Sequence, residues 1–356
     1  MRRTYYKPDN YLDADSLIQI DDGRILSFYF RDFRPLKIYD QKDFNEILSI
    51  NLEEILKKNK KENNSFYDDE DETFELDVIQ LKNKLILVGY YKYLIKIKLN
   101  ENNFESKVVF EDKEIILSIN ELPDGRIILF TNISILVLDN FILKDKYNIK
   151  INWKIVPLSS TENYYGDFNQ YFSSIILPDE RILLRSFSTE LSYHCGCGTH
   201  PPDEFIHSKI IFLNTKNFEE IKTTEEFESD CRALIFKNLI IIQDYHDIYM
   251  YDIKTLENIK KLKIEGNYNY FEKYNENQII AYSIYEKSNN LLIFRVEGND
   301  IIQNCEIKSK FEFREVIGWN FYSIIKYNNK ILFVLKDKRI ILLCHGAVLL
   351  LDLKLE

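Results

Sequence analysis

The 356-residue sequence predicts an all-β fold built from repeated units. A turn of the form Asp-x-Arg-Ile occurs four times, and an apolar run follows each copy. In the clearest copy, Asp124-Gly125 supplies the two positions of a tight hairpin turn that must tolerate unusual φ angles. Residues 127–130 are apolar at every position, which predicts a strand buried on both faces. A second apolar strand follows and ends on Asp139, so each unit is expected to contain a turn and two buried strands.

The spacing of these units predicts a β-propeller. Successive copies lie about 40 to 60 residues apart, near the period of a propeller blade. Because each blade contains about four short strands, seven units predict a seven-bladed β-propeller formed by a single domain, residues 1–356. The strong copies begin at Asp22, Asp124, Asp179 and Asp337, and weaker copies occupy residues 83–85, 237–239 and 277–279.

This pattern resembles degenerate WD40-type repeats. Residues 122–127, Leu-Pro-Asp-Gly-Arg-Ile, are similar to that family's turn between its first two strands. Residues 38–40, Ile-Tyr-Asp, are similar to the Trp-Asp ending of its third strand. No unit carries the family's Gly-His pair or a Trp in the third-strand dipeptide. The buried hydrogen-bond network of a standard repeat is therefore expected to be absent.

The units are expected in chain order. Unit 1 uses residues 16–20, 24–30 and 36–39, with an outer strand near 46–50. The apolar positions from Leu52 onward fit a helical stripe, and the charged, Asn-rich stretch 57–71 is expected to be a loop. The other six units are expected within residues 76–99, 122–139, 182–213, 232–251, 271–295 and 331–352.

The last unit ends with too few residues for an outer strand. An open propeller would expose an unpaired edge there. Residues 2–7 are rich in Thr and Tyr and stop at Pro8, so we expect them to supply that outer strand. In an alternative register, residues 321–327 form the first strand of the last blade and residues 347–353 its outer strand, which leaves the N-terminal segment free.

Charge and composition exclude several functional classes. The net charge of -10 is spread over interspersed Lys and Glu, which argues against nucleic-acid binding. The longest apolar run, 340–351, is interrupted by His345 and Gly346 and is too short to span a bilayer, and the start has no secretory apolar segment. Five cysteines, an odd number, indicate reduced thiols. We expect a cytoplasmic protein without a membrane or nucleic-acid partner.

The most unusual stretch is a loop insertion expected at about residues 186–208. It holds three of the five histidines and two of the five cysteines. Zn²⁺ favours four such ligands in a tetrahedral array, so a structural zinc site is one interpretation. The other is a Gly/Pro-rich surface loop with incidental His and Cys, because Cys-x-Cys is tighter than the spacing of standard zinc sites. The candidate ligands are His194, Cys195, Cys197, His200 and His207.

Repeated charged residues form two further candidate sets. The arginines after the turns, Arg24, Arg126, Arg181 and Arg339, form either a phosphate-binding ring or, as we favour, solvated charges that pair with nearby acids. Asp40, Asp139, Asp252 and Asp352 are interpreted as turn-capping residues. The sequence contains no Gly-rich phosphate loop, nucleophile elbow or metalloprotease pattern, so no catalytic or cofactor-binding residue is assigned.

These observations favour a non-enzymatic scaffold or adaptor that binds other proteins. The WD40 resemblance implies that loops between second and third strands, and between blades, open on one face. The insertion 186–208 and the loops 57–74, 157–170 and 308–320 would then share that face, and loops on a rigid scaffold build binding surfaces. The alternative is a propeller enzyme or a metal-binding protein that uses residues 194–207.

Overall fold

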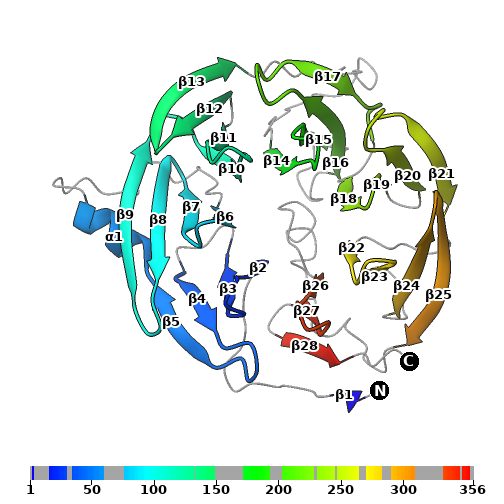
Figure 1. The fold of residues 1–356 in the computed structure, drawn as a ribbon, viewed down its shortest axis with the longest axis horizontal. Helices are drawn as coiled ribbons and strands as arrows, with labels where there is room; N and C mark the ends of the chain where they lie inside the picture. Colours follow the sequence, from blue (N-terminus) through cyan, green and yellow to red (C-terminus); the bar gives the residue numbers. More distant parts are fainter. Residues whose placement is uncertain are drawn as a thin grey trace, which may run out of the picture.

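Seven four-stranded antiparallel sheets contain all the strands in the part of the chain that the structure describes. They stand side by side in a ring, which confirms the all-β propeller fold (Figure 1). In blades 1 to 6 the first strand lies near the centre of the ring and the fourth on the rim (Figure 1). The computed structural model describes residues 2–3, 16–29, 34–59, 76–131, 133–148, 171–192, 203–227, 231–244, 247–263, 270–282, 290–308, 332–344 and 347–352.

Blades 1 to 4 follow one another in the first two thirds of the chain. Blade 1 contains β2 (Ser16–Gln19), β3 (Ile25–Phe28), β4 (Leu36–Tyr39) and β5 (Glu46–Ile50), and helix α1 (Leu52–Asn59) follows it. Blade 2 contains β6 (Leu76–Gln80), β7 (Ile86–Tyr90), β8 (Tyr93–Leu99) and β9 (Phe104–Glu111). Blade 3 contains β10 (Ile116–Glu121), β11 (Ile127–Thr131), β12 (Ser134–Asp139) and β13 (Ile142–Asn148). Blade 4 contains β14 (Tyr171–Ile176), β15 (Ile182–Ser192), β16 (Asp203–Leu213) and β17 (Glu220–Thr223).

Blades 5 to 7 complete the ring. Blade 5 contains β18 (Arg232–Phe236), β19 (Leu239–Asp244), β20 (Asp247–Asp252) and β21 (Asn258–Lys263). Blade 6 contains β22 (Tyr270–Lys273), β23 (Gln278–Tyr282), β24 (Asn290–Glu297) and β25 (Asp300–Lys308). Blade 7 contains β26 (Leu332–Val334), β27 (Ile340–Cys344), β28 (Ala347–Asp352) and, from the other end of the chain, β1 (Arg2–Arg3).

The second strand of a blade is apolar where neighbouring blades cover both of its faces. In β11, Ile128 and Phe130 pack with Ile182 and Leu184 of blade 4. The alternate residues of β11 belong to the cluster that blade 2 forms with blade 3. Side chains of a strand point alternately to its two faces, so a stretch packed between two blades, such as residues 127–130, is apolar at successive positions.

The Asp-x-Arg turn is a three-residue loop, wider than the predicted two-residue turn. The amide of Leu122 donates to the Arg126 carbonyl at 2.8 Å, and the amide of Gly125 donates to the Leu122 carbonyl at 2.9 Å. One residue of the loop adopts positive φ, 88° at Gly125, 69° at Glu180 and 69° at Lys338. The Asp side chain accepts the Arg amide, as Asp124 Oδ1 does from Arg126 at 3.1 Å. This geometry is a type I turn followed by a left-handed residue.

The turns between third and fourth strands confirm two of the predicted turn-capping residues. Asp40 Oδ1 accepts the Lys42 amide at 2.7 Å, and Asp252 Oδ1 accepts the Lys254 amide at 2.8 Å. Asp139 differs, because its Oδ1 accepts the side-chain amide of Asn140. The backbone of Asp352 pairs with Arg2.

Side-chain to backbone hydrogen bonds join the central turns of several blades. The amide of Lys336 donates to Gln19 Oε1, that of Asp21 to Gln80 Oε1, and that of Lys82 to Glu121 Oε2, at 2.7 to 2.8 Å. They link blade 7 to blade 1, blade 1 to blade 2 and blade 2 to blade 3. The joints between blades 3 and 4 and between blades 4 and 5 cannot form this bond. The residue that would donate is a proline, Pro123 or Pro178, and the residue that would accept is an isoleucine, Ile176 or Ile235.

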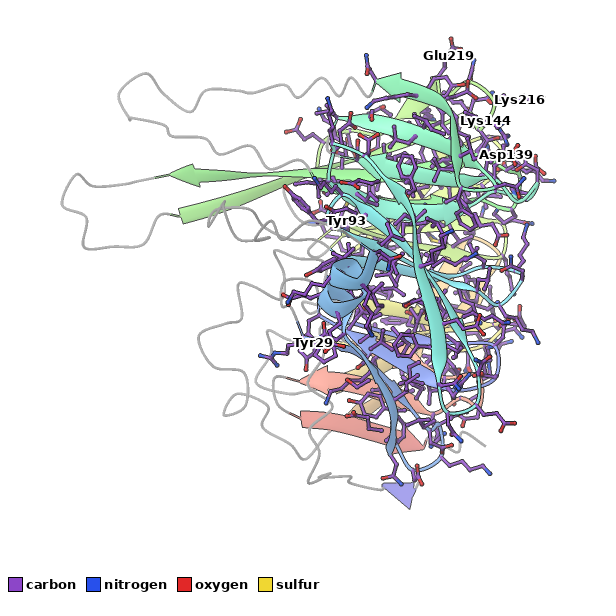
Figure 2. All side chains as sticks on the ribbon, turned by 90° about the vertical axis from the view of Figure 1, so that its left-hand side faces the viewer. Tyr29, Tyr93, Asp139, Lys144, Lys216 and Glu219 are labelled. Carbon is purple, nitrogen blue, oxygen red and sulfur yellow. The ribbon has the colours of Figure 1, made fainter. Side chains whose placement is uncertain are left out.

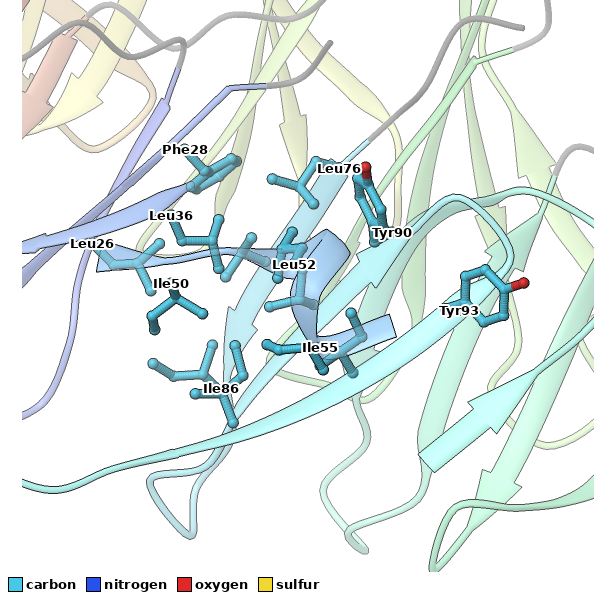
Figure 3. Packing of buried hydrophobic residues seen from close by; sticks show 14 of the residues in the cluster. Leu26, Phe28, Leu36, Ile50, Leu52, Ile55, Leu76, Ile86, Tyr90 and Tyr93 are labelled. Atoms are coloured by element: carbon cyan, nitrogen blue, oxygen red, sulfur yellow. The ribbon is translucent and has the colours of Figure 1, made fainter. Parts of the chain in front are cut away.

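Helix α1 is present where the apolar stripe predicts it. The Asn51 side chain accepts the Glu54 amide at 3.2 Å and so caps the first turn. Leu52, Ile55 and Leu56 are buried against apolar residues of blades 1 and 2 (Figure 3). The helix has eight residues, and no helix among the described residues is long and apolar enough to cross a membrane.

The loop insertion predicted at 186–208 is largely strand, which corrects its boundaries. β15 continues to Ser192 and β16 begins at Asp203, and the two strands are paired from Ile182↔Leu213 to Ser192↔Asp203. The other three predicted loops lie mostly or wholly outside the described residues: residues 57–59 of the first belong to α1, whereas 157–170 and 309–320 are not described.

The N-terminal residues close the ring as expected. Arg2 pairs with Asp352 and Arg3 with Leu351, so β1 is the outer strand of blade 7. β28 is the third strand from the centre, and the alternative register is therefore wrong. Residues 4–7 of the predicted strand lie outside the described residues.

We expect removal of residues 1–9 to lower the melting temperature markedly or to cause aggregation. The deletion removes β1 and exposes the outer edge of β28. Differential scanning fluorimetry of the truncated chain, beside a control lacking residues 354–356, measures the effect. Coincident melting curves for the truncated and complete chains would contradict closure by β1.

Candidate functional site

The hairpin of β15 and β16 is the longest strand pair that the structure describes. Both strands have eleven residues. β14 pairs with β15 only as far as Phe187, and β17 pairs with β16 only at Ile211–Leu213, so the distal half of the hairpin is a two-stranded ribbon. It projects from one side of the disc (Figure 2).

The structure describes one of the five predicted metal ligands. His194, Cys195, Cys197 and His200 lie outside the described residues, between the two ends of the hairpin. His207 lies in β16, where its backbone pairs with Ser188. Among the residues that are described, no three His, Cys, Asp or Glu side chains come together in a way that could hold a metal ion.

The base of the hairpin is tied to blade 5 by buried polar groups. Arg185, 4% exposed, extends from β15 and donates from Nη1 to the Cys231 carbonyl at 3.3 Å. The Ser208 hydroxyl accepts the Cys231 amide at 3.1 Å. Both interactions reach the start of β18, so they hold the hairpin against the next blade. Sequence reasoning missed this pair, although an arginine that ends the apolar run 182–184 was a usable signal.

Several other described groups lie on the same side of the disc as the hairpin. Figure 2 places α1, Tyr29 and Tyr93 on that side, and Asp139, Lys144, Lys216 and Glu219 on the other. The Arg34 guanidinium lies 4.6 Å from the centre of the Tyr29 ring. Arg and Tyr side chains are frequent in protein interfaces. We call this side the hairpin face, defined by the distal half of the hairpin, α1, Tyr29 and Tyr93.

A buried network lies between blades 2 and 3. The Thr131 and Ser134 hydroxyls and the Lys146 ammonium group all donate to the Glu114 carboxylate. Burial raises the pKa of Glu114, but the bonds from Lys146 and the two hydroxyls outweigh it and hold the pKa below its usual value. This network joins the segment before β10 to the end of β11, the start of β12 and the strand β13. It involves other residue types than the Gly-His and Trp-Asp pairs of a standard WD40-type repeat.

The arginines of the Asp-x-Arg turns pair with the preceding acids, as the favoured interpretation predicts. The Nε of Arg126 lies 2.8 Å from Asp124 Oδ2, and Arg24, Arg181 and Arg339 make the equivalent ion pairs. Burial raises the pKa of Asp22 and Asp337, but bonds from the arginines outweigh it and lower both pKa values.

Three of these arginines also join neighbouring blades. Arg24 donates to the Asn100 carbonyl of blade 2 at 2.9 Å, and Arg339 donates to the Gln41 carbonyl of blade 1 at 2.5 Å. Arg181 donates to the Ile253 carbonyl of blade 5. Their side chains are 17% to 18% exposed, against 35% for Arg126. These guanidinium groups are therefore structural links between blades, which argues against a phosphate-binding ring.

A polar seam crosses the innermost strands of blades 2, 3 and 4. Asp77 Oδ2 accepts the Ile119 amide at 2.6 Å. The hydroxyls of Ser118 and Ser174 lie 2.8 Å apart, and Asn120 Nδ2 donates to Ser174 Oγ at 2.5 Å. Loss of solvation raises the pKa of Asp77 to about 6, although two backbone amides and Ser118 oppose the change. The seam holds the inner strands together and contains a buried carboxyl group with a raised pKa.

Comparison with solved structures identifies propellers. Over 98% of its length the chain is similar to a virginiamycin B lyase from Staphylococcus aureus, with 9% identity, 97% of that chain covered and a TM-score of 0.53. Over 99% it is similar to a chain of the mitotic checkpoint complex, with 8% identity, 94% coverage and a TM-score of 0.53. Over 96% it is similar to BBS1N, solved in complex with ARL6DN, with 10% identity, 91% coverage and a TM-score of 0.51.

These neighbours are propeller-type proteins, and they confirm the resemblance to WD40-type repeats at the level of fold. At such low identity a likeness shows the fold alone. No protein-family model matches the sequence, and no curated protein matches it.

We expect Arg339→Ala to destabilise the protein more than Arg126→Ala, by about 1 to 3 kcal/mol. Both variants lose the ion pair with the preceding Asp, but only Arg339 has a described hydrogen bond from its guanidinium to the neighbouring blade. Urea denaturation of the two variants gives the comparison directly. Equal free energies of unfolding would show that the link to Gln41 contributes nothing.

Asp77→Asn should remove part of the pH dependence of stability. Because folding raises the pKa of Asp77 from 3.8 to about 6, its contribution is present below pH 4 and is lost as the pH rises through 6. The wild type should therefore lose about 1 to 1.5 kcal/mol between pH 5 and 7.5 through this group, and Asp77→Asn should not. Urea titrations at both values, with exposed Asp145→Asn as control, measure the difference. Parallel pH profiles for all three proteins would refute the assignment.

Proposed function

We propose that the protein is a non-enzymatic scaffold that binds other proteins on the hairpin face. The observation that carries this proposal is the β15–β16 hairpin, whose paired strands extend beyond their neighbours in blade 4 and project from the disc (Figure 2). Arg185 and Ser208 anchor its base to blade 5. A projecting element held by a rigid support is suited to binding, because little order is lost when a partner docks.

The charged groups near this face support a binding role. Glu114 is bonded to Lys146, and Glu111 lies 3.5 Å from Lys92. A catalytic site would need titratable groups that converge on a pocket, whereas these groups pair with one another. Two of the three neighbours were solved in complexes with other proteins, which is compatible with a scaffold, and the lyase is the counterexample.

Replacing residues 188–207 with Asn-Gly should abolish partner binding and leave the fold intact. Phe187 and Ser208 pair with each other, so a two-residue turn fits between them. Affinity capture from the native cell, followed by mass spectrometry, should recover proteins with the wild type that are lost with this variant.

A matched control for this variant alters the opposite side of blade 4. Lys216→Glu with Glu219→Lys keeps the net charge and should retain the captured proteins. Circular dichroism and melting curves show whether each variant is folded. Full retention of partners by a folded hairpin variant would refute the proposed function.

A second candidate function is a structural zinc site at the tip of the hairpin. Pairing of Ser192 with Asp203 holds the two ends of the 193–202 segment side by side. This segment contains His194, Cys195, Cys197 and His200, which are the ligand types that zinc prefers. His207 lies four residues further along β16 from Asp203, about 13 Å away along the strand, so we exclude it from the proposed set.

We expect elemental analysis of the purified protein to find about one zinc per chain. Cys195→Ser with Cys197→Ser should lose the metal, and Cys305→Ser, in β25, should keep it. Chelation should lower the melting temperature of the wild type only. Well under one zinc per chain in the wild type would rule out the site.

A further inference from the structure

The outer edge of β16 loses its partners at the base of the hairpin. β17 pairs with Ile211–Leu213, and the chain that follows makes a last isolated bridge between Phe227 and Ser208. Beyond Ser208, no described strand pairs with this edge over residues 203–207. Within the described part of the chain, the backbone groups of residues 203–207 that point outward therefore have no strand partner, and such groups can pair with another strand.

The chain leaves this edge at Ser208. The Phe227 amide donates to the Ser208 carbonyl at 2.8 Å, and the Cys231 amide donates to the Ser208 hydroxyl at 3.1 Å. The chain is thus back at Ser208 after the three residues 228–230. A segment that left Ser208, paired with the five residues 203–207 and came back to Ser208 would need about ten residues in extended conformation. The segment 228–230 is too short to be the missing strand.

The hairpin also lacks the charge that protects other edges of the molecule. Lysines on edge strands discourage pairing with another chain. The outer strand β13 contains two lysines and β21 contains three, whereas residues 186–208 contain no Lys or Arg and three acids. The acids of the hairpin are Glu190, Asp203 and Glu204.

We propose that residues 203–207 of β16 bind an extended, Lys- or Arg-rich segment of a partner protein as an added β-strand. In this mode backbone hydrogen bonds supply affinity, and the acids of the hairpin attract the basic segment. A second copy of this chain is a poor occupant, because pairing of two such edges would bring acids of like charge together. The proposal rests on the scaffold function and names the chemistry of its partner.

The direct test uses a fluorescein-labelled nine-residue peptide of alternating Lys and Thr, and a copy with N-methyl groups on alternate amides. Fluorescence anisotropy with the full chain should show binding of the first peptide. The methylated copy should bind at least about tenfold more weakly, because it cannot complete the ladder. Slower amide exchange at residues 203–207 in the wild type should accompany binding, which makes the test independent of any variant.

Charge variants locate the site. Asp203→Lys with Glu204→Lys should weaken peptide binding at least about tenfold. Glu219→Lys with Glu220→Lys makes the same charge change in the same blade. Glu219 lies on the opposite side (Figure 2) and Glu220 begins β17 beside it, so this variant should have less than about a twofold effect. Equal losses would show non-specific charge attraction, and equal binding of the methylated peptide would show that no strand is added. Either result overturns the proposal, as does a dimer in sedimentation that Asp203→Lys with Glu204→Lys dissociates.

Failure of this proposal differs from failure of the scaffold function. If the 188–207 replacement loses the captured proteins while the wild type ignores the peptide, the hairpin is a binding element but its edge does not add a strand. If the replacement retains all captured proteins, the scaffold function fails whatever the peptide does.

Discussion

The structure depends on the face-to-face packing of neighbouring blades. A second strand such as β11 serves two interfaces at once, so residues 127–130 are apolar on both faces of the strand. The close approach is visible at Gly89 in β7, where a Cβ atom would lie 2.8 Å from Ile116 Cγ2 of blade 3. Steric fit of this kind sets the spacing of the blades, and it makes each blade unstable without its neighbours because one apolar face would be exposed to water.

Hydrogen bonds cross the joints between several blades, and the groups that form them differ from joint to joint. Hydrogen bonds from backbone amides to the side chains of Gln19, Gln80 and Glu121 link the blades at the joints around blades 1 and 2. The joint from blade 3 to blade 4, where Pro123 cannot donate, relies instead on hydroxyl and amide groups around Ser174. Arg181 and Arg185 cross from blade 4 to blade 5. Apolar packing is common to the five joints from blade 1 to blade 6, whereas these directional bonds fix the relative height and rotation of adjacent blades.

Buried strands and their turns could be predicted from sequence because each leaves a local signal. The rim strands and the distal hairpin do not, since exposed strands such as β13 have no core to face and therefore no apolar run. The ribbon at 188–192 is mostly polar, so it was interpreted as loop. Hydrogen bonds between blades could not be predicted from the sequence either, because an arginine such as Arg339 donates to a backbone carbonyl about 300 residues away. Backbone acceptors carry no side-chain identity that a sequence pattern could show.

Closure by β1 has a consequence for the order of synthesis. β1 precedes every other described strand and β28 follows them all, yet the two pair with each other. Blades 1 to 6 each contain four consecutive strands and can form while the chain is still emerging from the ribosome. Blade 7 cannot be completed until β28 has been made, and Arg2–Arg3 must remain unpaired until then. The ring is thus assembled progressively and sealed only after β28 has been translated.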